Sequence, residues 1–131
     1  GSEGKALVGK RVLSVISTGG RAEAYCPEGY NRFTMRQLLA PIEQTARLCG
    51  MGYLPPIVVH GTLGMTRPEM ERHAADYRRL VEGLRDGAFD LEAATDWPRL
   101  NLDLDALWEL ARSAPPLEAG TAAPEPASSA H

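Results

Sequence analysis

The chain has 131 residues, a formal net charge of -3 at pH 7 and a sequence pI near 5.6. This length suits one domain with a hydrophobic core of its own. The acidic balance argues against a nucleic acid partner, because binding to a phosphate backbone needs a basic surface. No apolar run approaches the roughly 20 residues that span a bilayer, and we see no secretory leader. We therefore expect a cytoplasmic protein in which any membrane role is peripheral.

The first predicted element is a strand over 11–17, where an apolar, β-branched run shows no alternation of polar and apolar residues. This pattern is typical of a buried parallel strand. The run ends abruptly in a turn of four small residues: Ser17, Thr18, Gly19 and Gly20. Ligands of open α/β sheets bind just beyond the carboxyl ends of the strands, and glycine lets backbone N–H groups approach a ligand. The sequence predicts a cofactor-binding loop here, with an ordinary strand-to-loop turn as the alternative.

A helix should follow, because Thr34 and Gln37 have the spacing of a capping box. Apolar residues then recur at helical spacing at Leu38, Leu39, Ile42, Ala46 and Cys49. Pro41 lies inside this pattern, so we expect a kink or a shifted start. Gly50 or Gly52 should end the helix.

A second apolar strand is expected over 56–61, followed by a helix that Thr66 and Glu69 cap and that runs to about Asp86. One face of this helix is apolar, and we expect that face to pack on the core. The residues of that face are Met70, Ala74, Tyr77, Val81 and Leu84.

The order strand, helix, strand, helix predicts an α/β fold with parallel strands. We divide the chain into a domain segment over 1–86, a helical extension over 87–112 with a short helix over 100–110, and a disordered Pro- and Ala-rich tail over 113–131. Open α/β sheets commonly carry about five or six strands, whereas two are expected here. Such a sheet would leave an edge on both sides, so the chain is interpreted as the C-terminal half of a larger fold.

Several short motifs share one resemblance. They are Gly9-Lys10, the turn over 17–20, Tyr25, the segments GYNRF over 29–33 and LAPI over 39–42, LCGM over 48–51, and LPP over 54–56. Together they resemble the flavodoxin-like NAD(P)H:quinone oxidoreductases, the family of DT-diaphorase and of the ancillary proteins of glutathione-regulated potassium-efflux systems. The resemblance covers roughly residues 5–86 and is closer to the efflux-ancillary branch.

This resemblance implies an α/β fold that is the C-terminal portion of a flavodoxin-like doubly wound parallel sheet. It implies a homodimer with FMN or FAD at the strand ends, NAD(P)H as co-substrate, and two-electron hydride transfer to a quinone by the complete protein. Alternatives are a regulatory ancillary subunit that docks on a potassium/proton antiporter at the inner membrane, and an inactive truncated fragment. The family's phosphate-binding loop would lie upstream of residue 1.

The resemblance also assigns site residues. It places Ser17, Thr18, Gly19 and Gly20 against the flavin, and Tyr25 at the flavin carbonyl edge and the substrate. Asn31 stands where DT-diaphorase has an active-site histidine, so a mechanism that uses an imidazolium does not carry over. We take Tyr25 and Asn31 as candidate catalytic residues, with loop packing and capping as their alternative role.

Other polar residues give weaker signals. His60 follows the second strand and could line a pocket, although a hydrogen-bonded core or loop histidine is the favoured interpretation. Cys26 and Cys49 show no metal or redox spacing and are expected to be free thiols. No histidine pair at metal spacing is present in the chain, so no metal site is predicted.

Overall fold

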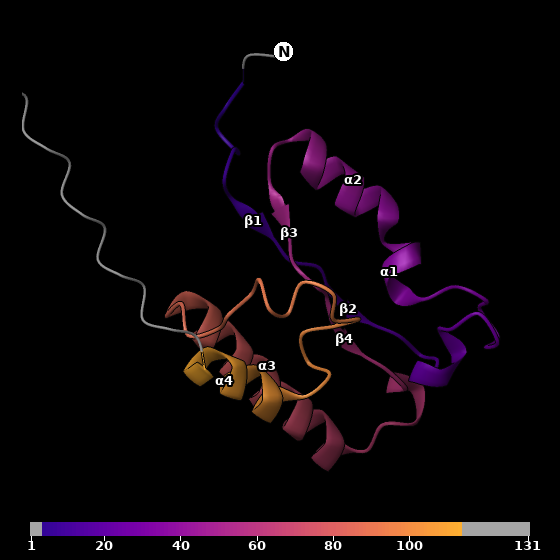
Figure 1. The fold of residues 1–131 in the computed structure, drawn as a ribbon. Coiled ribbons are helices and arrows are strands. Elements are labelled where there is room, and N and C mark those ends of the chain that lie inside the picture. The colour runs from indigo at the N-terminus through magenta and orange to yellow at the C-terminus, as the bar shows by residue number, and fades with distance from the viewer. Residues whose placement is uncertain (1–3, 114–131) are drawn as a thin grey trace, which may run out of the picture.

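The computed structural model describes residues 4–113. The predicted disordered tail therefore lies outside the described residues, apart from Ser113, which ends the last helix. The elements are β1 (Arg11–Val12), β2 (Val15–Ser17), η1 (Ala22–Ala24), α1 (Met35–Leu38), α2 (Ala40–Leu48), β3 (Gly52–Tyr53), β4 (Ile57–Val59), η2 (Thr62–Gly64), α3 (Arg67–Arg85) and α4 (Leu104–Ser113). Helices α1 and α2 lie at one side of the strands, and α3 and α4 lie side by side at the other (Figure 1).

The strands form two short parallel pairs, β1 with β3 and β2 with β4. Parallel pairing is confirmed, but the prediction of one continuous strand over 11–17 is wrong. Val12 lies opposite Tyr53, and Val15 lies opposite Ile57, so the register shifts by one residue between the two pairs.

Two prolines explain this interruption. Pro55 and Pro56 lie between β3 and β4 and have no N–H group to donate to the neighbouring strand. The N–H groups of Leu54 and Ile57, on either side of them, each donate to a carbonyl of the first strand segment at 3.0 Å. The hydrogen bonds between the two strand segments therefore continue on both sides of the proline pair. Between β3 and β4 the chain has one residue more than between β1 and β2, as in a β-bulge.

The first helix begins and breaks as expected. The Thr34 N–H donates to Gln37 Oε1 at 2.8 Å and the Gln37 N–H to Thr34 Oγ1 at 3.2 Å, which completes the capping box. Leu39 separates α1 from α2, and Pro41 lies in the first turn of α2. The predicted effect of Pro41 is confirmed. Leu39 and Ala46 are the buried residues of this segment.

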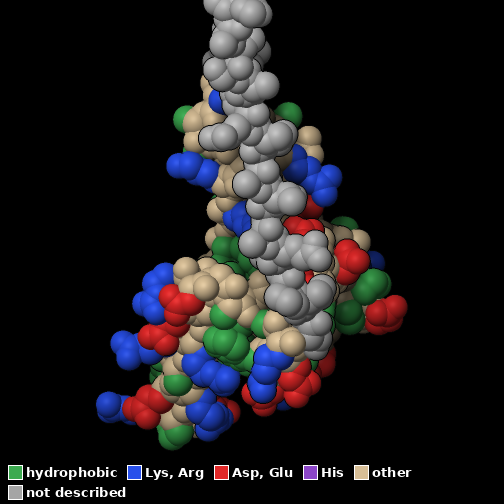
Figure 2. Space-filling view, turned by 60° about the vertical axis from the view of Figure 1, so that its left-hand side comes forward, with side chains coloured by type: hydrophobic (Ala, Val, Ile, Leu, Met, Phe, Trp, Pro, Cys, Tyr) green, Lys and Arg blue, Asp and Glu red, His purple; other side chains and the backbone are tan. Residues whose placement is uncertain are grey.

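The predicted core face of α3 is confirmed only at its end, where Leu84 packs against the core. Met70, Tyr77 and Val81 are 53%, 44% and 41% exposed, whereas Leu80 and Gly83 of the adjacent stripe are buried. Figure 2 shows hydrophobic side chains exposed among charged ones in the lower part of the molecule, where α3 and α4 lie. Met70, Tyr77 and Val81 do form an apolar stripe on α3, as the sequence pattern indicates, but within residues 4–113 no element covers this stripe.

The core is built from both the domain segment and the extension. Ile57 and Leu80 pack with Ala94, Leu100 and Leu107, and all five are at most 2% exposed. Partly buried side chains surround them: Leu13, Leu84, Phe89, Leu91, Trp97 and Leu104. The extension is therefore packed into the core, and its helix begins four residues later than predicted.

The extension also closes one edge of the sheet. Asn101 Nδ2 donates to the Val58 carbonyl at 2.7 Å, and the Val58 N–H donates to Asn101 Oδ1 at 2.9 Å. The Leu100 N–H donates to the Pro56 carbonyl at 2.8 Å. A side-chain amide thus replaces a neighbouring strand beside β4, which corrects the expectation of two open edges. The β2 edge stays open, and Val15 on it is 52% exposed.

Candidate ligand site at the strand ends

The loops that follow β2 and β4 lie side by side. The Thr18 N–H donates to the Val59 carbonyl at 2.9 Å, and the Gly61 N–H donates to the Gly20 carbonyl at 2.9 Å. The Thr62 N–H returns to the Thr18 carbonyl at 3.0 Å. Parallel strands bring their carboxyl ends to one side of a sheet, so the predicted cofactor loop and the His60 loop meet there.

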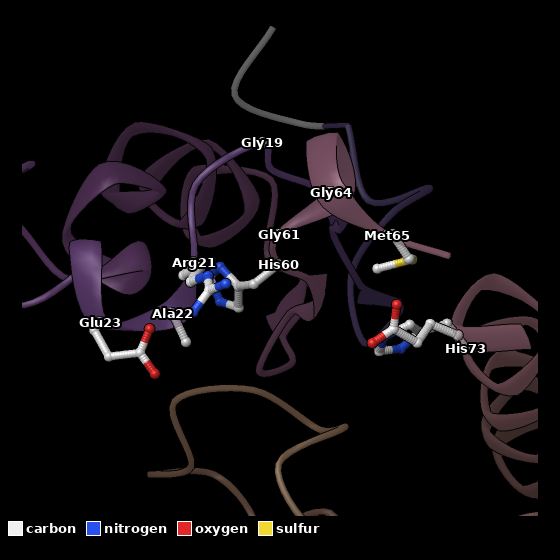
Figure 3. A pocket seen from close by; sticks show the side chains of 10 residues that line it. Gly19, Arg21, Ala22, Glu23, His60, Gly61, Gly64, Met65 and His73 are labelled. Atoms are coloured by element: carbon white, nitrogen blue, oxygen red, sulfur yellow. The ribbon is translucent and has the colours of Figure 1, made fainter. Parts of the chain in front are cut away.

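A cavity of about 380 Å³ opens at this junction. Figure 3 shows Arg21, Ala22 and Glu23 on one side of it and Met65 and His73 on the other, with His60 and Gly61 between them. Both cations and carboxylates are present, since Glu69 also lines the cavity. Among residues 4–113, no group of three or more His, Cys, Asp or Glu side chains is placed to hold a metal ion.

The glycine pair of the loop presents free backbone donors. Gly19 and Gly20 are exposed, and their N–H groups make no hydrogen bond with the described residues 4–113. Neither residue has a Cβ to keep a ligand away from these donors. Such a pair of amides fits the polar edge of a planar heterocycle, which carries carbonyl oxygens and ring nitrogens.

Tyr25 packs directly on this loop. A Cβ built on Gly20 would lie 3.5 Å from the Tyr25 ring and 3.6 Å from its hydroxyl oxygen. The Tyr25 ring also contacts His60, with ring centres 5.1 Å apart and a tilt of 46°. Three chemically distinct groups therefore converge from the two loops: the glycine amides and the Tyr25 phenol from the loop after β2, and the His60 imidazole from the loop after β4.

His60 is a hydrogen-bonded loop histidine, the interpretation that the sequence favours, and it also lines both cavities. Thr18 Oγ1 donates its proton to the Gly20 carbonyl at 2.8 Å, so the same oxygen accepts from His60 Nδ1 at 3.0 Å. This geometry assigns the proton to Nδ1 and leaves the Nε2 lone pair free. The only signal in the sequence was the position of His60 directly after a strand.

The surroundings of His60 favour its neutral form. Partial burial lowers its pKa below the usual value, and the nearby positive charge of Arg99 lowers it further. Glu23 and the hydrogen bond to the Gly20 backbone act in the opposite direction and are smaller. The imidazole is therefore a neutral hydrogen-bonding group at neutral pH.

Of the six predicted site residues, Gly19 lines the first cavity and Tyr25 lines the second, and the other four line neither. Ser17 is the exposed last residue of β2, and Asn31 lines neither cavity. The Asn31 N–H donates to the Ala24 carbonyl at 2.9 Å, which folds the loop back on itself. At Gly29, any Cβ would collide with the backbone carbonyl of Glu23, so only glycine allows this close approach. The structure thus groups Thr18, Gly19, Gly20 and Tyr25 but leaves Ser17 and Asn31 apart.

Cys26 and Cys49 are both free, as expected. Cys26 Sγ lies 3.3 Å from the Glu23 carbonyl, in the same loop. Neither cysteine lines the two cavities, so the thiols have no evident part in the site. Among the helices within residues 4–113, none is long and apolar enough to cross a membrane.

Curated relatives share this part of the chain. General stress protein 14 of Bacillus subtilis is 48% identical over 82 residues, which is 63% of this chain and 45% of the relative. The glutathione-regulated potassium-efflux system ancillary protein KefG of Cronobacter sakazakii is 34% identical over 90 residues, which is 68% of this chain and 49% of the relative. The chain therefore spans about half the length of the curated relatives it matches.

Solved structures show the same fold. The FMN complex of general stress protein 14 from Treponema denticola has 36% identity and a TM-score of 0.59, over 64% of this chain and 48% of that one. An NADPH-quinone reductase from P. pentosaceus has 31% identity and a TM-score of 0.55, over 60% and 46%. A structure described as a thermophilic tryptophan halogenase from Streptomycin violaceusniger has 34% identity and a TM-score of 0.59, over 62% and 47%. The names of these proteins differ, so the likeness establishes the fold rather than one reaction.

The family model described as flavodoxin-like fold matches residues 1–81, which confirms the family resemblance and the predicted fold class. The match contains both strand pairs, the glycine loop, Tyr25 and His60, and it ends within α3. Since it covers more than half of the sequence, the chain belongs to the family of proteins with a flavodoxin-like fold.

Proposed function

We propose that this chain supplies the flavin-edge part of an FMN-dependent NAD(P)H:quinone oxidoreductase, whose activity belongs to the complete protein. The observation that supports it is the pair of Gly19 and Gly20 N–H groups, which have no partner within residues 4–113 and lie beyond the ends of two parallel strands, with Gly20 next to the Tyr25 hydroxyl. The FMN complex of a relative and a neighbour named as an NADPH-quinone reductase support the same function. FMN is preferred to FAD because the relative's complex contains FMN.

In the proposed site, the Gly19 and Gly20 amides donate to the carbonyl edge of the isoalloxazine, where negative charge gathers on reduction. The Tyr25 hydroxyl donates at the same edge or to the quinone oxygen. When bound, FMN passes a hydride from NAD(P)H to the acceptor, and a proton from solvent completes the quinol. The neutral His60 holds the Thr18 side chain of the loop through its Nδ1 proton. Ser17 and Asn31 then have positioning roles rather than contacts with substrate.

The remainder of the site must come from outside this chain. The open edge of β2 and the exposed apolar face of α3 (Met70, Ala74, Tyr77 and Val81) are the surfaces on which the rest of a doubly wound domain would pack. That part would contain the residues that bind the FMN phosphate. The proposed assembly is a homodimer of complete domains in the cytoplasm.

An FMN titration tests this function, with quenching of flavin fluorescence as the readout. Saturable binding by the chain is expected, and Tyr25→Phe should weaken it, while Tyr30→Phe is the matched control because Tyr30 is 94% exposed. In the complete protein, Tyr25→Phe should also lower quinone turnover with NADPH. Equal FMN affinity and equal turnover in both variants would refute the role of Tyr25. No binding by the chain would favour the alternative of an inactive fragment for this chain in isolation.

A second candidate function is a regulatory one, which the similarity to KefG supports. In this case the protein would dock peripherally at the inner membrane on a potassium/proton antiporter, and its binding would matter more than its turnover. Co-purification with the cytoplasmic part of an antiporter encoded beside the gene tests this role. Robust turnover with simple quinones and no such complex would decide for the enzyme.

A further inference from the structure

A second cavity, of about 300 Å³, lies at the junction between the domain and its extension. His60 and Tyr25 line it on the domain side, together with the apolar side chains of Met35 and Val58. Asp96, Pro98 and Arg99 form the opposite wall. These three residues lie beyond the part of the chain that the family model matches, residues 1–81. This wall therefore lies outside the segment that the family model matches.

The extension wall is held rigidly. Arg36 Nη1 donates to the carbonyls of Thr95 at 2.7 Å and Trp97 at 3.1 Å. These hydrogen bonds attach α1 to the extension just before Arg99. Directly after Arg99, Leu100 is fully buried and the Asn101 amide pairs with Val58. A wall fixed on both sides is pre-organised, so a ligand does not have to pay for ordering it.

Arg99 is the unusual charge of this cavity. Its side chain is partly buried, yet its guanidinium makes no hydrogen bond or ion pair with the described residues 4–113. The other arginine that lines the cavity, Arg36 of α1, already donates to two carbonyls and lies 3.8 Å from Glu43. A partly desolvated guanidinium without a partner is suited to bind a carboxylate or sulfonate through two parallel hydrogen bonds. Asp96 also lines the cavity, but it is exposed, so solvent screens its repulsion of such an anion.

We propose that this cavity binds a planar aromatic acid, namely a quinone that carries a carboxylate or sulfonate, with its ring against Tyr25 and its anionic group on Arg99. The identity of the ring as a quinone rests on the proposed function, whereas the recognition of an aromatic anion does not. Arg99 is then a specificity-determining residue that the extension adds beside the shared strand-end site.

The test is a calorimetric titration of the full 131-residue chain with 1,4-naphthoquinone-2-sulfonate and with neutral 1,4-naphthoquinone, each with and without FMN. Arg99→Gln should weaken binding of the sulfonate about ten-fold or more and change binding of the neutral quinone less than about two-fold. Arg85→Gln is the control, because it removes the same charge from an exposed pair with Asp86. Asp96→Asn should strengthen binding of the sulfonate, a gain that misfolding does not produce.

Two results would overturn this inference. One is an Arg99→Gln variant that loses affinity for both quinones equally or for neither, and the other is the absence of saturable binding of either quinone under both conditions. The outcome is separable from that of the proposed function. Arg99-dependent binding of the sulfonate in a chain that fails to bind FMN would keep this inference and favour the inactive fragment for this chain in isolation. FMN binding without discrimination by Arg99 would do the reverse.

Discussion

The two edges of the sheet formed by β2 and β4 differ in whether their backbone groups find hydrogen-bond partners. Beside β4, the extension supplies an amide that pairs with Val58 and a leucine that fills the core, so this edge is complete within the chain. On the edge of β2 that faces away from β4, no described residue pairs with the strand, and Val15 is half exposed. The glycine loop continues from β2. The candidate flavin loop therefore follows the strand with the open edge, whereas the packing that stabilises the fold lies beside the closed edge.

The strongest test of this difference is a pair of substitutions at one register position. Ile57→Ala should lower the free energy of unfolding by about 3 kcal/mol, because it leaves a cavity in the core. Val15→Ala, directly opposite in the ladder, should cost less than about 1 kcal/mol, because its side chain is half exposed. Urea unfolding followed by far-UV circular dichroism measures both. Equal losses would mean that the β2 edge is covered in solution.

The closed edge itself is tested at Asn101. Asn101→Ala should lower the free energy of unfolding by about 2 kcal/mol, because the buried N–H and carbonyl of Val58 both lose their partner. Gln44→Ala, at an exposed position of α2, is the control and should stay within about 0.5 kcal/mol of the parent. The same urea titration applies. If both variants unfold at the same urea concentration, the Asn101 amide contributes nothing to the free energy of unfolding, and Asn101 does not close the edge.

On the open side, a methyl group should affect a ligand rather than the fold. A Cβ at Gly20 would meet the Tyr25 ring at an ordinary contact distance of 3.5 Å, so Gly20→Ala should leave the free energy of unfolding nearly unchanged. It should lower FMN affinity about ten-fold, because the methyl keeps the flavin from the backbone donors.

Gly52→Ala is the control for this substitution, since its Cβ also meets a neighbouring side chain at 3.5 Å, that of Arg11, but Gly52 lines neither cavity. Its FMN affinity should stay within about two-fold of the parent. Flavin fluorescence quenching measures both variants. A Gly20→Ala chain that binds FMN as tightly as Gly52→Ala would exclude the glycine amides from the flavin site.

The smallest expected effect is a pH dependence that arises at His60. Because its pKa is lowered in the folded chain, the unfolded chain binds more protons in the window just below the usual histidine value. The free energy of unfolding should therefore rise with pH through that window and fall as the solution is acidified. His60→Gln should flatten this slope below about pH 6.5. Urea midpoints of the two chains between pH 5 and 8 measure it, and identical slopes would show that His60 does not titrate abnormally.

The sequence alone supports a good part of this description. The apolar runs and capping pairs determined the strands and helices, because period and caps are local properties of the chain. The motifs around Gly19, Tyr25 and Pro41 identified the family. The same local reasoning predicted a continuous strand over 11–17, since the effect of Pro55 and Pro56 on the neighbouring strand is not local.

Only the tertiary structure decided which groups meet. His60 lies 42 residues from Thr18 in the sequence, and their hydrogen bond depends on the register of β2 with β4. Asn101 completes an edge strand through its side chain, which no periodicity reveals. The apolar pattern of α3 was visible in the sequence, but whether a helix face is covered depends on what packs against it. Local patterns determine elements, whereas burial, tautomer and cavity walls follow from long-range packing.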